Sequence, residues 1–164
     1  MFNIDLSNIK RQSGKTFTRI AAKAIIFVDD KLLMIESADG DLKFPGGGAE
    51  GNESAVEALK REVTEETGFI IKDVISQIGT TTEFKADKFE KEAFFEMISH
   101  YFICSLSEDK AETNMDEYEL ELQMRHVWIS LEDAIEQNNR VLNNKHNFWI
   151  ERELRVLNEL KGLM

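Results

Sequence analysis

Three glutamates near the middle of the chain have the spacing of a single helical face. Glu62, Glu65 and Glu66 stand at positions i, i+3 and i+4, so a helix would bring their carboxylates together. Like charges at this spacing destabilise a helix by roughly 0.2–0.5 kcal/mol per pair, and negative charge near a helix C-terminus opposes the helix dipole. A sequence that breaks both local rules indicates that these carboxylates have a function.

A glycine-rich segment leads directly into the predicted helix. Gly46, Gly47 and Gly48 follow Pro45, the only proline of the chain. Glycine adopts positive φ and has no Cβ, so its backbone carbonyl can turn inward. Flexible backbone and clustered negative charge therefore adjoin each other within residues 44–69.

The helix itself is predicted over residues 54–67. This stretch lacks Gly and Pro, and Gly68 stands where a helix C-cap is expected. Val56, Leu59 and Val63 fall on a second face, which would pack on a sheet. The helix thus has one apolar face for the core and a separate acidic face.

A simpler interpretation is a solvated acidic face on a protein that is acidic everywhere. Arg61 would then form ordinary i,i+4 ion pairs with Glu57 and Glu65. Two features oppose this interpretation. The three glutamates share their face with Ala55 and Ala58 rather than with lysines, and the glycine-rich segment precedes them directly.

The remaining elements are predicted to form the sheet that carries this helix. Segments rich in Ile, Val and Phe alternate with turn signals. The predicted strands are 18–28, 31–37, 42–44, one or two within 70–84, 94–106 and 125–130. Residues 107–121 are predicted as an acidic loop, Ser130 as a helix N-cap, and about 147–161 as a last helix. Strands interspersed with three helices predict an α/β or α+β domain with helices packed over a mixed sheet.

The composition limits the classes of partner. The chain has 164 residues, which fits one domain with a sizeable core. Its net charge is 20 − 31 = −11, which disfavours nucleic acid and anionic membranes but is compatible with metal cations. Cys104 is the only cysteine, so no internal disulfide is expected, which suits a reducing cytoplasm. Neither a signal peptide nor a membrane-spanning apolar run is predicted.

The stretch from Gly47 to Phe69 resembles the signature of the Nudix hydrolase family. That signature is G-x5-E-x7-R-E-U-x-E-E-x-G-U, where U is a bulky aliphatic or aromatic residue. Every fixed position is filled, by Gly47, Glu53, Arg61, Glu62, Val63, Glu65, Glu66, Gly68 and Phe69. The residues just before the signature (44–46) and the segment 128–134 also resemble the family. A complete signature favours an enzyme over a non-catalytic relative.

The resemblance implies a fold and an activity. The fold is the Nudix α/β/α sandwich, a mixed sheet flanked by helices, as one domain over residues 1–164 with an N-terminal extension at 1–16. The activity is hydrolysis of a nucleoside diphosphate linked to another moiety, with Mg²⁺ or sometimes Mn²⁺ as the cofactor. A diphosphate is anionic, so metal is needed to mask the charge of the glutamates.

The resemblance also implies roles for individual residues. Glu62, Glu65 and Glu66 match the metal-binding glutamates of the family, and the carbonyl of Gly46 matches a backbone ligand of the metal. The glycines at 46–48 form the loop that faces the metal and the substrate phosphates.

Two further roles follow from the same resemblance. Glu53 and Arg61 match positions that pair and brace the loop against the helix within the catalytic site. The general base is either a glutamate of the signature, with Glu66 the first choice, or a glutamate on a later loop. The later candidates, for which solvated loop charges are an equal alternative, are Glu117, Glu119 and Glu121.

The substrate is inferred only by elimination. Subtypes that cleave ADP-ribose, diadenosine polyphosphates, NADH or coenzyme A carry flanking residues that this chain lacks. What remains is a MutT-like hydrolase of a (deoxy)nucleoside triphosphate, which releases a nucleoside monophosphate and pyrophosphate. The alternatives are a non-nucleotide diphosphate as the substrate, or a nucleotide-binding module without turnover. The family also suggests a homodimer, for which the sequence assigns no face.

Overall fold

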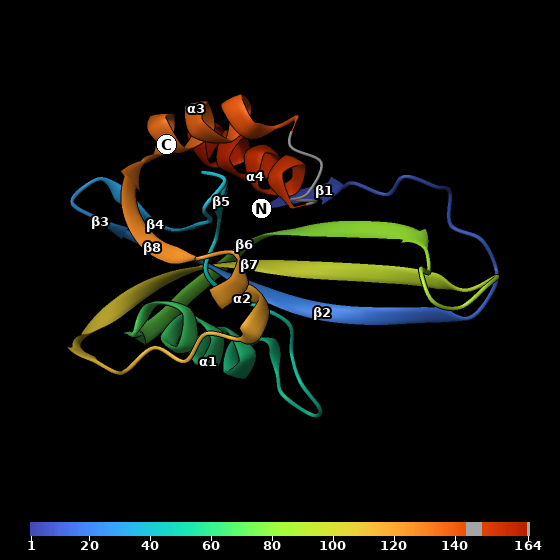
Figure 1. Cartoon of the computed structure of the whole chain (residues 1–164), viewed down its shortest axis with the longest axis horizontal. Coiled ribbons are helices and arrows are strands. Elements are labelled where there is room, and N and C mark those ends of the chain that lie inside the picture. Colours follow the sequence, from blue (N-terminus) through green and yellow to red (C-terminus); the bar gives the residue numbers. More distant parts are fainter. Residues whose placement is uncertain (144–148, 164) are drawn as a thin grey trace.

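A long sheet with strand order β1-β6-β7-β2 runs through the molecule (Figure 1). The structure is a computed structural model, which describes residues 1–143 and 149–163. β6 and β7 are antiparallel, whereas β1 pairs parallel with β6 and β2 pairs parallel with β7. This mixed pairing agrees with the predicted mixed sheet. The four strands are β1 (Phe2–Asp5), β2 (Thr16–Ile25), β6 (Phe69–Ala86) and β7 (Phe94–Lys110).

A second, smaller sheet is built around β4, which pairs antiparallel with three short neighbours. Only Ile26 separates β2 from β3, so one extended segment leads from the first sheet into the second. The single strand predicted over 18–28 is therefore two strands, one in each sheet. The members of this sheet are β3 (Phe27–Val28), β4 (Lys31–Glu36), β5 (Leu42–Lys43) and β8 (Arg125–Ser130).

Helices cover the sheets from two sides (Figure 1). α1 (Ala55–Thr67) and the short α2 (Glu117–Glu121) lie on one side, and α3 (Leu131–Val141) and α4 (Ile150–Leu163) lie on the other. This arrangement confirms the α/β/α sandwich. No helix in the described part of the chain is both long and apolar enough to cross a membrane.

Helix α1 begins and ends at the residues that the sequence indicates. Ser54 is the N-cap and forms a capping box with Glu57, and Gly68 is a left-handed C-cap with φ 73°. Leu59 and Val63 are fully buried against apolar side chains of β2, β4 and β7. Burial of side chains of this size stabilises the fold by roughly 1.5–3 kcal/mol each, which fixes the rotation of α1 and turns its acidic face away from this core.

The prediction of an acidic loop over 107–121 is wrong at both of its ends. β7 extends to Lys110, because this residue pairs with Phe69 at the start of β6 and its ammonium lies 4.8 Å from the centre of the Phe69 ring. At the other end Asp116 caps α2 and forms a capping box with Glu119. Only the residues between these two elements are loop.

The two ends of the chain are integrated into the fold. The segment 1–16, expected as an extension, contributes β1, and the buried Phe2 packs on Tyr101 with ring centres 5.6 Å apart. The predicted last helix, 147–161, corresponds to α4, although residues 147 and 148 lie outside the described residues. The helix cap predicted at Ser130 is confirmed, since its hydroxyl accepts a hydrogen bond from the Asp133 amide at 3.1 Å.

Candidate active site

Arg61 holds the glycine-rich loop against α1. Its guanidinium donates two hydrogen bonds to Glu53, at 2.8 and 2.9 Å, and a third to the carbonyl of Gly48 at 3.2 Å. The predicted pairing of Glu53 with Arg61 is thus present, and the bidentate geometry makes it a strong pair. The hydrogen bonds from Arg61 lower the pKa of Glu53 to about 2, so this carboxylate stays charged at neutral pH.

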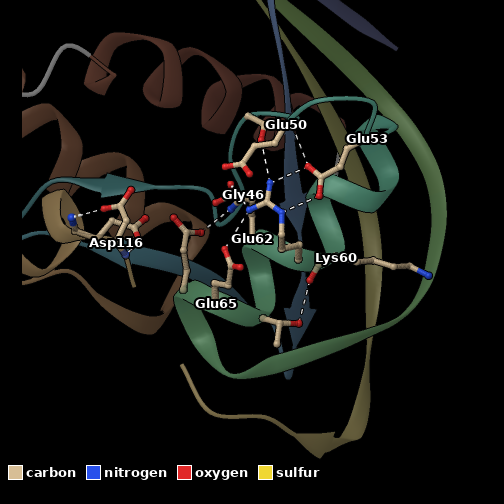
Figure 2. A network of polar contacts seen from close by, with 12 residues as sticks. Gly46, Glu50, Glu53, Lys60, Glu62, Glu65 and Asp116 are labelled. Atoms are coloured by element: carbon tan, nitrogen blue, oxygen red, sulfur yellow. Dashed lines mark hydrogen bonds and ion pairs between the residues drawn. The ribbon is translucent and has the colours of Figure 1, made fainter. Parts of the chain in front are cut away.

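Glu62 and Glu65 lie at the same guanidinium. Arg61 Nη1 is 2.9 Å from Glu62 Oε1 and 3.1 Å from Glu65 Oε2. Figure 2 shows Glu53, Glu62 and Glu65 gathered beside α1, whereas Lys60 extends away from them. Both side chains keep partial access to solvent, with 18% exposure for Glu62 and 32% for Glu65. The two carboxylates are therefore positioned by Arg61 yet still accessible.

Glu66 is the buried member of the acidic face. Its side chain is 2% exposed, and its Oε2 accepts a hydrogen bond from the backbone amide of Gly46 at 2.6 Å. Its Oε1 lies 2.8 Å from the ammonium of Lys43, on β5. The helix and the glycine-rich loop thus meet at this carboxylate.

The glycine-rich loop runs along the free edge of β2. Backbone hydrogen bonds from Ala22 and Ala24 to the carbonyls of Gly47 and Pro45 fix its register. Gly46 adopts a φ of 122°, and a Cβ there would lie 2.2 Å from the Ala22 carbonyl oxygen, so only glycine fits.

Two glycines of the loop are in contact with charged side chains, and neither contact was predicted from the sequence. The Gly46 carbonyl accepts a hydrogen bond from the ammonium of Lys23, and a Cβ on Gly47 would collide with the carboxylate of Glu62. The predicted carbonyl ligand therefore already binds a cation of the chain, and Gly47 makes room for a predicted carboxylate ligand.

Helix α2 brings one of the three later glutamates to the site. Glu119 is buried, and its Oε1 lies 3.2 Å from the ammonium of Lys43. Glu117 and Glu121 are exposed. Successive helical residues are about 100° apart, so 117 and 121 share the solvent face while 119 points the other way. The sequence left three glutamates as candidates for the general base, and the helical geometry places only one of them toward the site.

One cavity of about 440 Å³ joins these elements. Gly46, Gly47, Gly48, Glu62, Glu66 and Glu119 line it on one side, together with several basic and aromatic side chains. The basic residues of the lining were not predicted from the sequence; they are Arg19, Lys23, Lys43, Lys85, Lys88 and Arg152. One signal was present in the sequence, because Lys23 is the only polar residue within the stretch 20–28.

Burial and close charges shift the pKa values of several groups in the cavity. Burial is the main cause that lowers the pKa of Lys23 to about 8, with Lys43 adding to the effect. For Lys43 burial opposes the charge, but Glu66 and Glu119 together raise its pKa. Burial and then Glu66 raise the pKa of Glu119, against the opposing charge of Lys43. The cavity therefore holds closely coupled charges of both signs.

The chain was compared with known proteins by sequence and by structure. A sequence model of the NUDIX domain matches residues 17–149, which include the whole signature from Gly47 to Phe69. The chain belongs to the Nudix hydrolase family. It is accordingly an enzyme of the class that acts on phosphorus-containing anhydrides. A search of curated proteins found no match.

Solved structures share the fold of this Nudix hydrolase. A MutT protein from Bacillus halodurans is 19% identical over 73% of this chain and 72% of its own, with a TM-score of 0.52. A Nudix hydrolase from Nitrosomonas europaea is 19% identical over 85% and 90%, with a TM-score of 0.51. A UDP-X diphosphatase is 18% identical over 73% and 54%, with a TM-score of 0.52. At these identities the likeness shows the fold alone.

Each residue expected to bind metal in this Nudix hydrolase has an oxygen in contact with a positive or polar group of the chain. Within residues 1–143 and 149–163, no three acidic, histidine or cysteine side chains converge as a preformed metal cluster. Lys43 instead pairs with Glu66, Lys23 with the Gly46 carbonyl, and Arg61 with the other two glutamates. Carboxylate and carbonyl oxygens are nevertheless the donors that Mg²⁺ takes, so these residues fit the metal in kind.

Proposed function

We propose that this Nudix hydrolase is a Mg²⁺-dependent pyrophosphohydrolase that cleaves a nucleoside diphosphate linked to another moiety. The observation that carries the proposal is the shared cavity, in which the acidic face of α1 and the glycine-rich loop open toward a set of basic side chains. An acidic face alone would repel a diphosphate. In the shared cavity, the carboxylates can bind a metal and the basic side chains can bind phosphate, so together they can hold both parts of a metal–diphosphate complex.

The residues that would hold the metal are Glu62, Glu65, Glu66 and the carbonyl of Gly46. Mg²⁺, or Mn²⁺ in its place, would neutralise phosphate charge, orient the substrate and lower the pKa of a bound water. Lys43 and Lys23 keep the buried oxygens of Glu66 and Gly46 compensated. Positive charge delivered by a metal would therefore compete with these lysines for the same oxygens.

The chain itself supplies positioning and proton transfer. Arg61 and Glu53 hold the loop and α1 in fixed relation, which keeps the Gly46 amide on Glu66. Glu66 is our first choice for the general base, and Glu119 is the second, because it reaches the same lysine from α2. A base must lie within hydrogen-bond reach of the water that it activates, and both carboxylates border the cavity.

For the substrate we favour a MutT-like reaction on a (deoxy)nucleoside triphosphate, which releases a nucleoside monophosphate and pyrophosphate. The cavity volume suits a small molecule of nucleotide size. The basic lining suits several phosphates, and exposed Tyr118 on the rim offers an aromatic face for a base. The alternatives are a non-nucleotide diphosphate as the substrate and a binding module without turnover.

A substrate panel with product analysis tests this proposal. Nucleoside triphosphates, nucleotide sugars, dinucleotides and a non-nucleotide diphosphate would be incubated with Mg²⁺, with Mn²⁺ and with a chelator. We expect cleavage at a diphosphate that stops when the chelator is added. Release of orthophosphate only, or no cleavage with either metal, would contradict the proposal.

We also propose that the enzyme works in a reducing cytoplasm. Cys104, the only cysteine, is a buried free thiol whose pKa burial raises to about 12, so it is poorly placed to form a disulfide. The homodimer stays a prediction, which analytical ultracentrifugation would check.

A further inference from the structure

The arginines of the chain fall into two groups by their partners. The chain has seven arginines, and six of them form ion pairs with glutamates. Within the described part of the chain, the guanidinium of Arg19 forms no hydrogen bond or ion pair. The protein carries eleven more negative than positive charges, so carboxylates are abundant. An arginine left without one, on the wall of the cavity, is therefore an exception that needs a reason.

The place of Arg19 follows from the pairing of β2 with the glycine-rich loop. Ala21 forms an antiparallel bridge with Gly48, and the Ala49 amide donates to the Ile20 carbonyl at 2.9 Å. Side chains two residues apart on a strand share a face, so Arg19 and Lys23 lie on the same face of β2. Both line the cavity. Lys23 reaches the loop at Gly46, and Arg19 reaches it further along.

The guanidinium of Arg19 rests directly on Gly48. A Cβ built on Gly48 would lie 2.3 Å from Arg19 Nε and 2.5 Å from Nη2, so the absence of a side chain creates the space that the guanidinium occupies. Arg61 donates a hydrogen bond to the carbonyl of the same glycine. Arg19 thus lies at the glycine-rich loop, on the cavity that Glu62 and Glu66 also line, and the loop does not neutralise it.

We infer that Arg19 is a substrate-binding residue that contacts non-bridging oxygens of the diphosphate on the Gly48 side of the carboxylate cluster. This inference rests on the proposed function. Guanidinium presents two parallel N–H donors that match the oxygens of a phosphate, and it keeps its charge at every relevant pH. No carboxylate of residues 1–143 and 149–163 lies within ion-pair distance of this guanidinium, so its donors are ready for an anionic ligand.

The test compares Arg19→Gln with wild type in binding and in turnover. The binding probe is α,β-methylene-ADP, whose bridging carbon resists hydrolysis, titrated by calorimetry in the presence of Mg²⁺. Hydrogen bonds to charged groups have the strength to weaken binding roughly 10- to 100-fold when one partner is lost. KM should rise by a similar factor while kcat changes little, because the contact exists in the ground state and in the transition state alike. Arg19→Lys keeps the charge but loses the paired donors, so it should recover only part of the affinity.

Arg140→Gln is the matched control. It removes the same charge from an exposed arginine of α3 whose side chain is 69% exposed, and it should bind the probe as wild type does. Loss of affinity in Arg140→Gln equal to that in Arg19→Gln would reduce the effect to net charge and overturn the inference.

Gly48→Ala provides a second and independent variant. Its Cβ meets only the end of a flexible side chain, and Gly48 has no positive φ, so the fold should tolerate the change while the guanidinium is displaced. We expect a smaller rise in KM than in Arg19→Gln. Adding Gly48→Ala to Arg19→Gln should have no further effect, since the group that it moves is already gone. Additive losses would contradict the contact.

The outcomes separate this inference from the proposed function. If wild type cleaves diphosphates and Arg19→Gln matches it in Kd and KM, the role of Arg19 fails and the proposed function stands. If wild type cleaves none, the proposed function fails, while a Kd for the probe that depends on Arg19 would still support the anion site. A wild type that does not bind the probe would overturn the role of Arg19 as well.

Discussion

Two cations on the wall of the same cavity, the buried Arg152 and the half-buried Lys43, each lie between two carboxylates. The guanidinium of Arg152 donates two hydrogen bonds to Glu153, at 2.8 and 2.9 Å, and one to Glu83 at 2.9 Å. Glu153 also accepts the backbone amide of Phe44 at 3.0 Å. This cluster ties α4 to β6 and to Phe44, which directly follows β5, and every charge in it has directional partners.

Lys43 forms the second cluster with Glu66 and Glu119, at 2.8 and 3.2 Å. Its contact with Glu66 Oε1 does not have the geometry of a hydrogen bond, and that atom accepts none from the described residues. An ammonium is a compact charge on a flexible stem, whereas guanidinium is a rigid fork. The arginine cluster therefore suits a structural role, whereas in the lysine cluster the proposed metal would compete with Lys43 for the carboxylates.

The largest expected effect is on folding and concerns the arginine cluster. Arg152→Gln should leave Glu83 and the fully buried Glu153 without a cation, and should lower the free energy of unfolding by about 3–5 kcal/mol. Urea denaturation would measure it. Arg155→Gln, on the exposed side of α4, is the control and should change stability by at most about 1 kcal/mol. Equal stability of the two variants would contradict a structural role for the arginine cluster.

The next effect is on turnover and concerns the lysine cluster. Glu66→Gln should lower kcat by roughly 10²–10³-fold, which corresponds to the several kcal/mol that a bound metal contributes. Glu65→Gln should also lower kcat by orders of magnitude. Stability should change little in either variant, because Lys43 keeps Glu119 and the repulsion on α1 is relieved.

Steady-state kinetics and thermal melts on the same samples would check both variants. Full activity in both would contradict the metal assignment. Unfolding of both would favour a purely structural role for the acidic face.

A smaller effect should separate the glutamates of α2. Glu119→Gln should lower kcat at least about tenfold, as expected for a group that assists proton transfer, whereas exposed Glu117→Gln should stay within about twofold of wild type. The same kinetic assay measures both. A loss in Glu117→Gln that equals the loss in Glu119→Gln would show that α2 acts through its overall charge.

The smallest effect is a dependence of stability on pH. Arg61 depresses the pKa of Glu53 from 4.5 in the unfolded chain to about 2. A depressed pKa stabilises the fold above pH 4.5, and this contribution is lost as the pH falls toward 2. Glu53→Gln should therefore show a shallower loss of melting temperature than wild type between pH 4.5 and 2. Parallel curves would show that the pair does not support the loop.

The sequence predicted the parts of the site that are local. The helix over 54–67 and its C-cap at Gly68 follow from signals within a few residues, and the spacing of the glutamates needs nothing but helical geometry. The pairing of Glu53 with Arg61 spans eight residues and was reached through the family resemblance. These features depend on short stretches of chain, so they could be predicted from the sequence.

The parts that were missed depend on distant partners. Lys43 acts through Glu119, seventy-six residues away, and Arg152 acts through Glu83, sixty-nine residues away. The residues that neighbour either cation in the sequence do not predict these contacts, because the contacts depend on how α2 and α4 pack on the rest of the fold. The choice among three glutamates at 117–121 also required knowing that this stretch is helical rather than a loop.

The most direct test of the account is metal binding by the free protein. Electron paramagnetic resonance of Mn²⁺ would measure the affinity of wild type, Glu66→Gln and Glu117→Gln, with Mg²⁺ added as a competitor. We expect one affinity for wild type and Glu117→Gln, displacement of Mn²⁺ by Mg²⁺, and binding at least about tenfold weaker in Glu66→Gln. Equal Mn²⁺ affinity in all three proteins would contradict the assignment of the α1 carboxylates as the metal site.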